Sequence, residues 1–187
     1  MTEREFQTEL IRGLRSHLFH VVPIPDSGGG ARFGAERVYD LGVGRDGLYY
    51  GIELKRGSTS LPFNSLQDHQ LAYLAECRRS GHTPLIICLF EHTGKLLNDR
   101  EKVRRSKKTL EAWAVNYEEF WCARKELSRK SAPLSWWREH GVELLPIRTP
   151  AFDKDGNPKF SKTGKREWNW GWDFRAVHEA MRLRRVA

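Results

Sequence analysis

The stretch RVYDLGVGRDGLYYGIELK, residues 37–55, contains two strand-like runs, 37–44 and 48–55, separated by a short turn. The turn contains the pair Asp46-Gly47, and Asp-Gly is a strong signal for a two-residue turn in a β-hairpin. Such a turn fixes the register of the hairpin, because each step outward adds one residue to each strand. The sequence therefore predicts an antiparallel hairpin at this point of a sheet.

The predicted register brings three charged residues together. Counted outward from the turn, Asp40 lies opposite Glu53, and opposed residues have their Cβ atoms about 5 Å apart on one face of the sheet. Lys55 lies two residues beyond Glu53 and points to the same face. Two carboxylates at that distance repel each other unless a cation lies between them, and oxygen ligands suit Mg²⁺ or Mn²⁺. We therefore expect a metal site suited to phosphodiester hydrolysis; the alternative is a solvated cluster of ion pairs.

Two helices are predicted on either side of this hairpin. The first covers residues 2–19, where Thr2 and Glu5 have the spacing of a capping box. The second covers about 66–79, with Ser65 as its expected N-cap. The apolar residues of the first helix repeat every four positions and should form one buried stripe: Phe6, Leu10, Leu14 and Leu18.

The rest of the chain predicts an α/β domain. Segment 83–91 is apolar on both faces, as expected of a central strand that is covered on each side. Further strands are predicted over 20–24, 110–115 and 142–147, further helices over 116–127, 133–140 (started by Ser131) and 173–185, and loops over 26–34, 56–64 and 149–167. This order predicts a central mixed β-sheet flanked by helices. We expect one domain over 1–187, with a core of about 2–92 and 110–147 and a C-terminal extension over 148–187.

The composition is that of a folded protein with an excess of positive charge. The 187 residues are 39% hydrophobic and 30% charged, which excludes a disordered chain. No apolar run approaches the roughly 20 residues needed to span a membrane, and the N-terminus has no signal core. The three cysteines are widely separated, so we expect reduced thiols in a cytoplasmic protein without membrane contact. The formal net charge of +8 suits a polyanionic partner, although a solvated basic surface would give the same value.

Asp40, then twelve residues, then Glu53-Leu54-Lys55 resembles the signature of the PD-(D/E)xK nucleases, with Tyr39 in place of the usual proline. Within that superfamily the chain resembles Holliday junction resolvases, best over about residues 5–92. Segments FQTELIRGL (6–14) and DSGGGA (26–31) resemble the archaeal type, and LPFNSLQDHQLAYL (61–74) and RKSAPLSWW (129–137) resemble the RecU type.

The resemblance implies a restriction-endonuclease-like fold and a Mg²⁺-dependent endonuclease that resolves four-way junctions by paired, symmetric cuts in DNA recombination and repair. Mn²⁺ is the expected substitute, and no organic cofactor is expected. Asp40, Glu53 and the Leu54 carbonyl would hold the metal, and Lys55 would support the attacking water. A homodimer at the nucleoid is implied, because a junction needs two symmetric cuts.

Two further residues are candidates for the same site. Glu9 matches the glutamate in the first helix of the archaeal enzymes and would be a third acid; the alternative is an exposed helical carboxylate. Gln70 shares a helical stripe with Leu74 and Cys77, so it should face the sheet and reach the site. The alternative for Gln70 is a buried amide bonded to the backbone.

Candidate DNA contacts lie in two other segments. Ser27 and Gly28 belong to a glycine-rich loop that would close over the DNA backbone, unless it is a plain surface loop. Lys130 would contact phosphate beside Ser131, whose alternative role is to cap the following helix.

Trp168, Trp170 and Trp172 alternate as in a strand, which places all three on one face. They would either stack on unpaired bases of a junction or pack against the body of the protein.

Two other functions share these sequence features. A repair or restriction-type nuclease acting on duplex or nicked DNA would have the same catalytic residues. A DNA-binding module with a vestigial metal site would bind DNA without cutting it.

Overall fold

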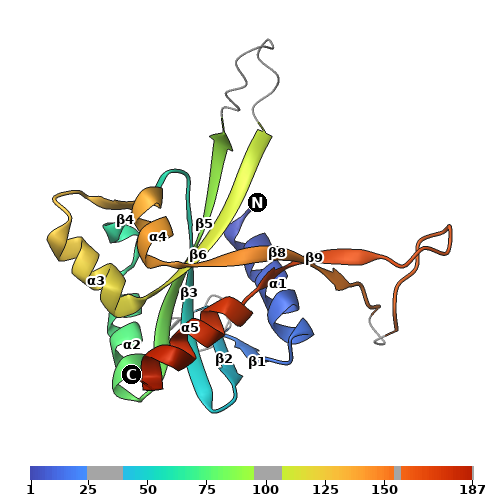
Figure 1. The fold of residues 1–187 in the computed structure, drawn as a ribbon, viewed down its shortest axis with the longest axis horizontal. Helices are drawn as coiled ribbons and strands as arrows, with labels where there is room; N and C mark the ends of the chain where they lie inside the picture. The colour runs from blue at the N-terminus through green and yellow to red at the C-terminus, as the bar shows by residue number, and fades with distance from the viewer. Residues whose placement is uncertain (25–39, 95–106, 154–156, 187) are drawn as a thin grey trace, which may run out of the picture.

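The fold is an α/β arrangement around a seven-stranded mixed sheet (Figure 1). The computed structural model describes residues 1–24, 40–94, 107–153 and 157–186. The strands lie in the order β1-β2-β3-β5-β6-β8-β9; β3 and β5 are parallel, and the other neighbouring pairs are antiparallel. Their bounds are β1 His20–Pro23, β2 Leu41–Arg45, β3 Leu48–Gly57, β5 Thr83–Gly94, β6 Lys107–Asn116, β8 Val142–Pro150 and β9 Trp168–Asp173. The predicted fold class, a mixed sheet flanked by helices, is confirmed.

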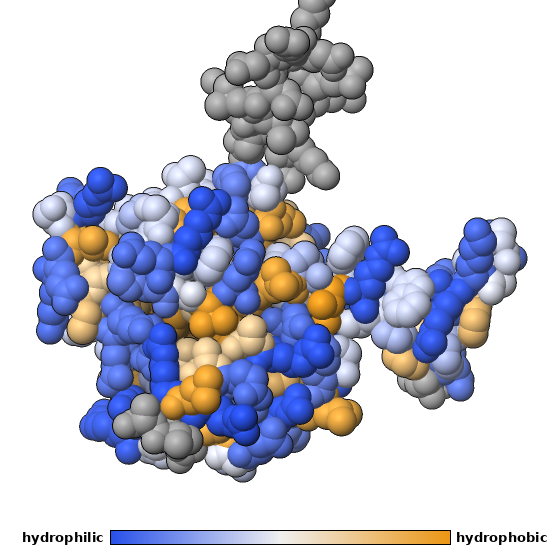
Figure 2. Space-filling view, in the orientation of Figure 1, coloured by the Kyte–Doolittle hydropathy of each residue, from blue (hydrophilic) through white to orange (hydrophobic). Residues whose placement is uncertain are grey.

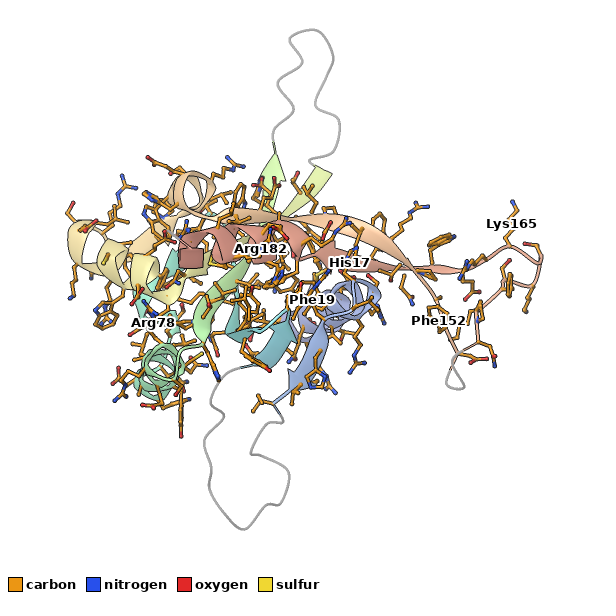
Figure 3. The ribbon with its side chains drawn as sticks, turned by 60° about the horizontal axis from the view of Figure 1, so that its bottom comes forward. His17, Phe19, Arg78, Phe152, Lys165 and Arg182 are labelled. Atoms are coloured by element: carbon orange, nitrogen blue, oxygen red, sulfur yellow. The ribbon has the colours of Figure 1, made fainter. Side chains whose placement is uncertain are left out.

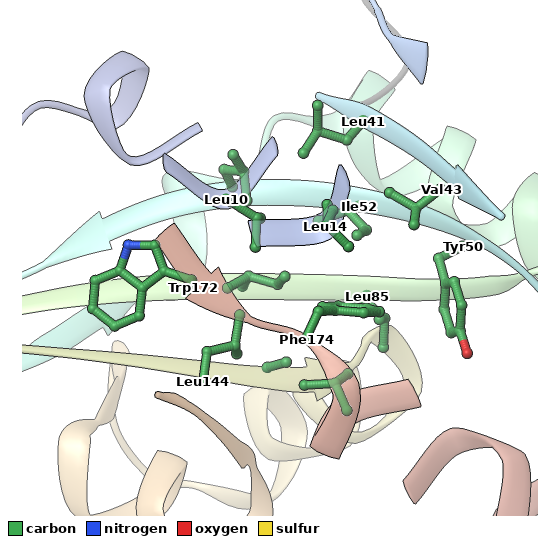
Figure 4. Close-up of a cluster of buried hydrophobic side chains, with 14 of the residues drawn as sticks. Leu10, Leu14, Leu41, Val43, Tyr50, Ile52, Leu85, Leu144, Trp172 and Phe174 are labelled. Atoms are coloured by element: carbon green, nitrogen blue, oxygen red, sulfur yellow. The ribbon is translucent and has the colours of Figure 1, made fainter. Parts of the chain in front are cut away.

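Helices cover both faces of the sheet, and each face has its own hydrophobic core. Helices α1 (Glu3–Ser16) and α5 (Arg175–Val186) pack on one face (Figure 4). Helices α2 (Asp68–Arg79), α3 (Tyr117–Glu126) and α4 (Leu134–His140) pack on the other. The side chains of β5 alternate between the two cores, and every one from 85 to 90 is fully buried, as predicted for a central strand.

Strands β2 and β3 form the predicted hairpin. Asp46 and Gly47 have φ angles of 51° and 74°, and two positive φ angles define the type I′ turn that suits the twist of a hairpin. The strands pair outward from this turn as far as Leu41 and Ile52, which is the register that the turn predicts.

The first helix is shorter than predicted. Thr2 Oγ1 accepts a hydrogen bond from Glu5 N at 3.2 Å, and Glu5 Oε2 accepts one from Thr2 N at 2.6 Å, so the capping box is confirmed. The helix ends at Ser16, however, and Leu18 adopts a positive φ of 62° with 87% of its surface exposed. The prediction that Leu18 belongs to the apolar stripe was wrong. The left-handed turn at Leu18 exposes its side chain, and Phe19 enters the core instead.

The connection over 56–64 is not a plain loop. Strand β3 continues to Gly57, and β4 (Ser60–Pro62) pairs with β7 (Ser131–Pro133) in a second, two-stranded sheet. A short 3-10 helix, η1 (Phe63–Ser65), follows β4. The prediction failed because the partner strand lies about 70 residues away in the chain, where no local pattern reveals it.

Two helix starts also differ from prediction. Helix α2 begins at Asp68, and Ser65 does not cap it, because its hydroxyl donates to Pro62 O at 2.6 Å. Helix α4 begins at Leu134. Ser131 does not start this helix, because it belongs to strand β7.

The C-terminal residues complete the core. Trp172, Phe174, Val177 and Met181 are buried in the cluster that includes α1. Gly13 makes room for this packing, since its backbone touches that of Trp172. The predicted loop over 26–34 lies outside the described residues. In the described part of the chain, none of the helices has the length and apolar character required to cross a membrane.

Candidate active site

Asp40 and Glu53 come together at the open end of the hairpin. Asp40 directly precedes β2, and its N–H donates to Ile52 O at 3.0 Å. Its Oδ2 accepts a hydrogen bond from Leu54 N at 2.6 Å, which fixes the carboxylate against β3. Because Leu41 pairs with Ile52, the next step of the register places Asp40 beside Glu53. Only 5% of Asp40 and 1% of Glu53 is exposed, so two acids are buried at neighbouring positions.

Lys55 and Gln70 both contact the Glu53 carboxylate. Lys55 Nζ lies 2.7 Å from Glu53 Oε1, and Gln70 Nε2 donates to the same oxygen. Gln70 is itself held in place, because its Oε1 accepts from Gln67 N, the residue before α2, at 3.1 Å. The first turn of α2 therefore positions an amide donor on the acid, and the prediction that Gln70 faces the sheet is confirmed.

The donor set suits a hard divalent cation. Asp40 and Glu53 supply carboxylate oxygens, and Leu54, which follows Glu53 in β3, could add its backbone carbonyl. Two buried carboxylates at neighbouring positions form the kind of site whose charge a divalent cation would offset. Among the described residues no three His, Cys, Asp or Glu side chains gather as a metal group. Mg²⁺ usually keeps several water ligands, so one or two protein carboxylates are enough to bind it.

Glu9 lies on the other flank of α1 from Asp40. Gln7 Nε2 donates to Asp40 O at 3.3 Å, whereas Glu9 Oε2 accepts from Trp172 Nε1 at 3.1 Å. Positions 7 and 9 lie about 200° apart around a helix, so the two side chains point to opposite flanks of the apolar stripe. Burial raises the pKa of Glu9 above its usual value, although the Trp172 hydrogen bond opposes this shift. The structure brings Asp40, Glu53, Lys55 and Gln70 together and places Glu9 against β9.

Sequence reasoning missed two residues that support the site. The first is Gln67, whose N–H binds Gln70. The two residues have the spacing of a capping box with glutamine at its third helical position, so the sequence did contain a signal for this contact. Gln7 had no such signal, because its acceptor is a backbone oxygen that only the packing of α1 brings within reach.

Lys130 lies in a cationic groove. This groove, of about 540 Å³, is lined by Ser60, Pro62, Phe63, Asn64, Arg124, Arg129, Lys130 and Ser131. These lining residues include three cations, two hydroxyls and no acid. Lys130 O accepts from Phe63 N at 3.1 Å, which joins the groove to η1, the segment just before α2. Ser27 and Gly28 lie outside the described residues.

Similarity to known proteins is found among solved structures. No protein-family model and no curated protein sequence matches the chain. Among solved structures the chain is similar to Hjc, a Holliday junction resolvase of the archaeal hyperthermophile Archaeoglobus fulgidus. The similarity covers 75% of this chain and 94% of that chain, with 16% sequence identity and a TM-score of 0.47.

Proposed function

We propose that this chain is a metal-dependent DNA endonuclease that cuts four-way junctions by paired, symmetric phosphodiester cleavage. The observation that carries the proposal is the pair of buried carboxylates, Asp40 and Glu53, at the open end of one hairpin, with Lys55 and Gln70 both on Glu53. A solvated cluster of ion pairs would be exposed, whereas these acids are not.

Mg²⁺ is the proposed cofactor, with Mn²⁺ as a substitute. Asp40, Glu53 and the Leu54 carbonyl would hold it. Glu9 is proposed as a further acid, for which its carboxylate would have to leave Trp172 Nε1 and turn to the Asp40 side of α1. When bound, the ion would neutralise charge on the phosphodiester and favour attack by water.

The protein's own residues then have separate roles. The Leu54 N–H fixes the orientation of Asp40, and Gln70 fixes that of Glu53. Lys55 Nζ carries three protons and binds Glu53 with one of them, so it can also donate to the attacking water or to the charge that develops on phosphate.

Branched DNA is the proposed substrate, on the basis of the sequence resemblance. The net charge of +8 gives affinity for the DNA backbone. Lys130 and its groove would contact phosphate next to α2, and Ser27 and Gly28 are proposed to contact the backbone near the cut. A symmetric homodimer would present two such sites to opposing strands.

The test is cleavage of an end-labelled, immobile four-way junction in Mg²⁺, beside a linear duplex of matched sequence. The wild type should nick opposing arms symmetrically and leave the duplex intact. Asp40→Asn should abolish cutting, because it removes one of the two metal carboxylates. Asp46→Asn is the matched control: it makes the same chemical change in the same hairpin, at a residue whose side chain is 65% exposed, and should cut normally.

Each other outcome selects a rival function. Equal cutting of junction and duplex would replace the junction specificity with a repair or restriction-type activity. Binding without cutting, by wild type in Mg²⁺ and in Mn²⁺, would reject the nuclease in favour of a DNA-binding module.

A further inference from the structure

An arm extends from the body of the molecule at the far end of β8 and β9. We define the arm as the described residues of 148–170. Beyond Pro150 and Trp168, the last paired residues, it continues through bridges between Phe152 and Pro158 and between Phe160 and Arg166. Figures 1 and 2 show it projecting to the right of the body of the molecule.

Backbone hydrogen bonds give the arm a defined shape. Ala151 N donates to Glu167 O at 3.0 Å, and Glu167 N donates to Lys159 O at 2.9 Å. Lys159 N donates in turn to Ala151 O at 2.8 Å. Backbone hydrogen bonds thus join three short segments of the arm, so its side chains project from a backbone of defined conformation.

The arm exposes large aromatic side chains. Trp168 and Trp170 are 51% and 53% exposed, and Phe152 and Phe160 are 50% and 59% exposed. Trp172, two residues further along β9, is only 2% exposed. The tryptophans of β9 therefore divide: Trp172 packs into the core, and the other two remain available on the arm.

Cations accompany these rings. Arg148 lies over the ring of Trp170, with its guanidinium carbon 5.3 Å from the ring centre, and Arg166 lies over Trp168 at 5.6 Å. Five basic residues and two acidic ones belong to the arm: Arg148, Lys159, Lys162, Lys165 and Arg166 against Asp153 and Glu167. Figure 3 shows Phe152 and Lys165 at its outer part.

We propose that the arm binds unpaired nucleotides, with Trp168 and Trp170 stacking on bases and Arg148 and Arg166 contacting the adjacent phosphates. Aromatic faces combined with cations are what single-stranded nucleic acid requires, because every base has a face to stack and every linkage has a negative charge. A regular duplex offers the charge but keeps its bases stacked inside. The branch point of a junction is the place where bases can be unstacked.

A second copy of the chain is the other occupant to consider for an exposed aromatic surface. The arm carries a net positive charge, so two arms would repel each other when they meet, whereas a polyanion is attracted. The charge therefore favours nucleic acid. This inference rests on the proposed function only in taking DNA as the partner, and it does not depend on cleavage.

The test is equilibrium binding of fluorescein-labelled oligonucleotides in EDTA, which separates binding from cutting. The probes are a single strand, a linear duplex, and a four-way junction with unpaired nucleotides at its centre. Trp168→Ala/Trp170→Ala should raise the Kd for the single strand about 5- to 150-fold for each stacked base that is lost. The Kd for the duplex should change much less. Arg148→Gln/Arg166→Gln should make the slope of log K for the single strand against log salt concentration shallower, by about 0.7 for each phosphate contact that is lost.

Two controls separate stacking from other effects. Trp168→Tyr/Trp170→Tyr keeps an aromatic face at each position and should restore most of the affinity. Tyr49→Ala removes an aromatic side chain that is 57% exposed on β3, outside the arm, and should bind all three probes as the wild type does.

Three other outcomes distinguish the failure of the arm proposal from the failure of the nuclease proposal. Unchanged single-strand binding by the double alanine variant would reject the arm as a nucleotide site, and the nuclease proposal would stand. If the same variant changed only the sedimentation of the protein, from dimer to monomer, the arm would instead be an interface between copies. Arm-dependent binding by a protein that cuts no DNA would support the arm and reject the nuclease.

Discussion

Gly13→Ala should destabilise the protein, although alanine is the better helix former. A Cβ at position 13 would lie 2.0 Å from Trp172 O, 2.7 Å from Trp172 N and 2.8 Å from Trp172 C. All three are backbone atoms, so no side-chain rotation can relieve the contact. Carbon atoms pack at about 3.5–4.0 Å, so α1 and β9 would have to separate by more than 1 Å.

The two effects on stability have opposite signs. Replacing glycine inside a helix by alanine stabilises it by about 1 kcal/mol when nothing touches the new methyl group. Overpacking that forces the backbone to move costs about 1–3 kcal/mol, occasionally more. The cost at Gly13 should lie at the upper end of this range. Moving β9 away from α1 would also separate Trp172 from Phe6, whose rings meet edge to face at 5.6 Å. We expect the free energy of unfolding to fall by about 2 kcal/mol net.

Urea denaturation followed by circular dichroism measures this difference. At an unchanged m-value, the urea concentration at half unfolding should fall. Arg12→Ala is the matched control, since it places alanine at the preceding, exposed position of the same helix. Its free energy of unfolding should stay within about 0.5 kcal/mol of the wild type. If Gly13→Ala were as stable as the wild type or more stable, the backbone contact between α1 and β9 would be refuted.

Two further predictions concern the site and the acid stability. Gln70→Ala removes the amide that holds Glu53 Oε1, so the cleavage rate at low Mg²⁺ should fall about 10- to 100-fold; an unchanged Mg²⁺ titration would argue against this role. Hydrogen bonds from Arg138 lower the pKa of Glu111 from 4.5 to about 2. Because the folded-state pKa is lowered, this pair stabilises the protein above about pH 4.5, and the stabilisation disappears as the pH falls towards 2. Glu111→Gln should therefore be less stable than the wild type at pH 7 and lose less stability on acidification; parallel curves of unfolding free energy against pH would contradict this.

The arrangement of the candidate centre was predictable because its geometry is local. An Asp-Gly turn sets the register of one hairpin, and the alternation of side chains along each strand determines which residues point to the same face. Asp40, Glu53 and Lys55 lie within 16 residues of chain, so no long-range contact was needed to place them on one face. Gln70 followed from helical periodicity, which is equally local.

The surroundings of that centre depended on contacts between distant segments. Glu9 has Trp172 as its partner because α1 packs on β9, 163 residues further along the chain. The pairing of β4 with β7 joins segments that each look like loops.

The alternating tryptophans show the limit most clearly. By sequence, Trp168, Trp170 and Trp172 are equivalent residues on one face of a strand. The structure separates them, because β9 leaves the body of the protein between Trp172 and Trp170, so the first is 2% exposed and the second 53%. Periodicity determines which way a side chain points from its strand. Whether another segment lies there to cover it is decided only when the whole chain has folded.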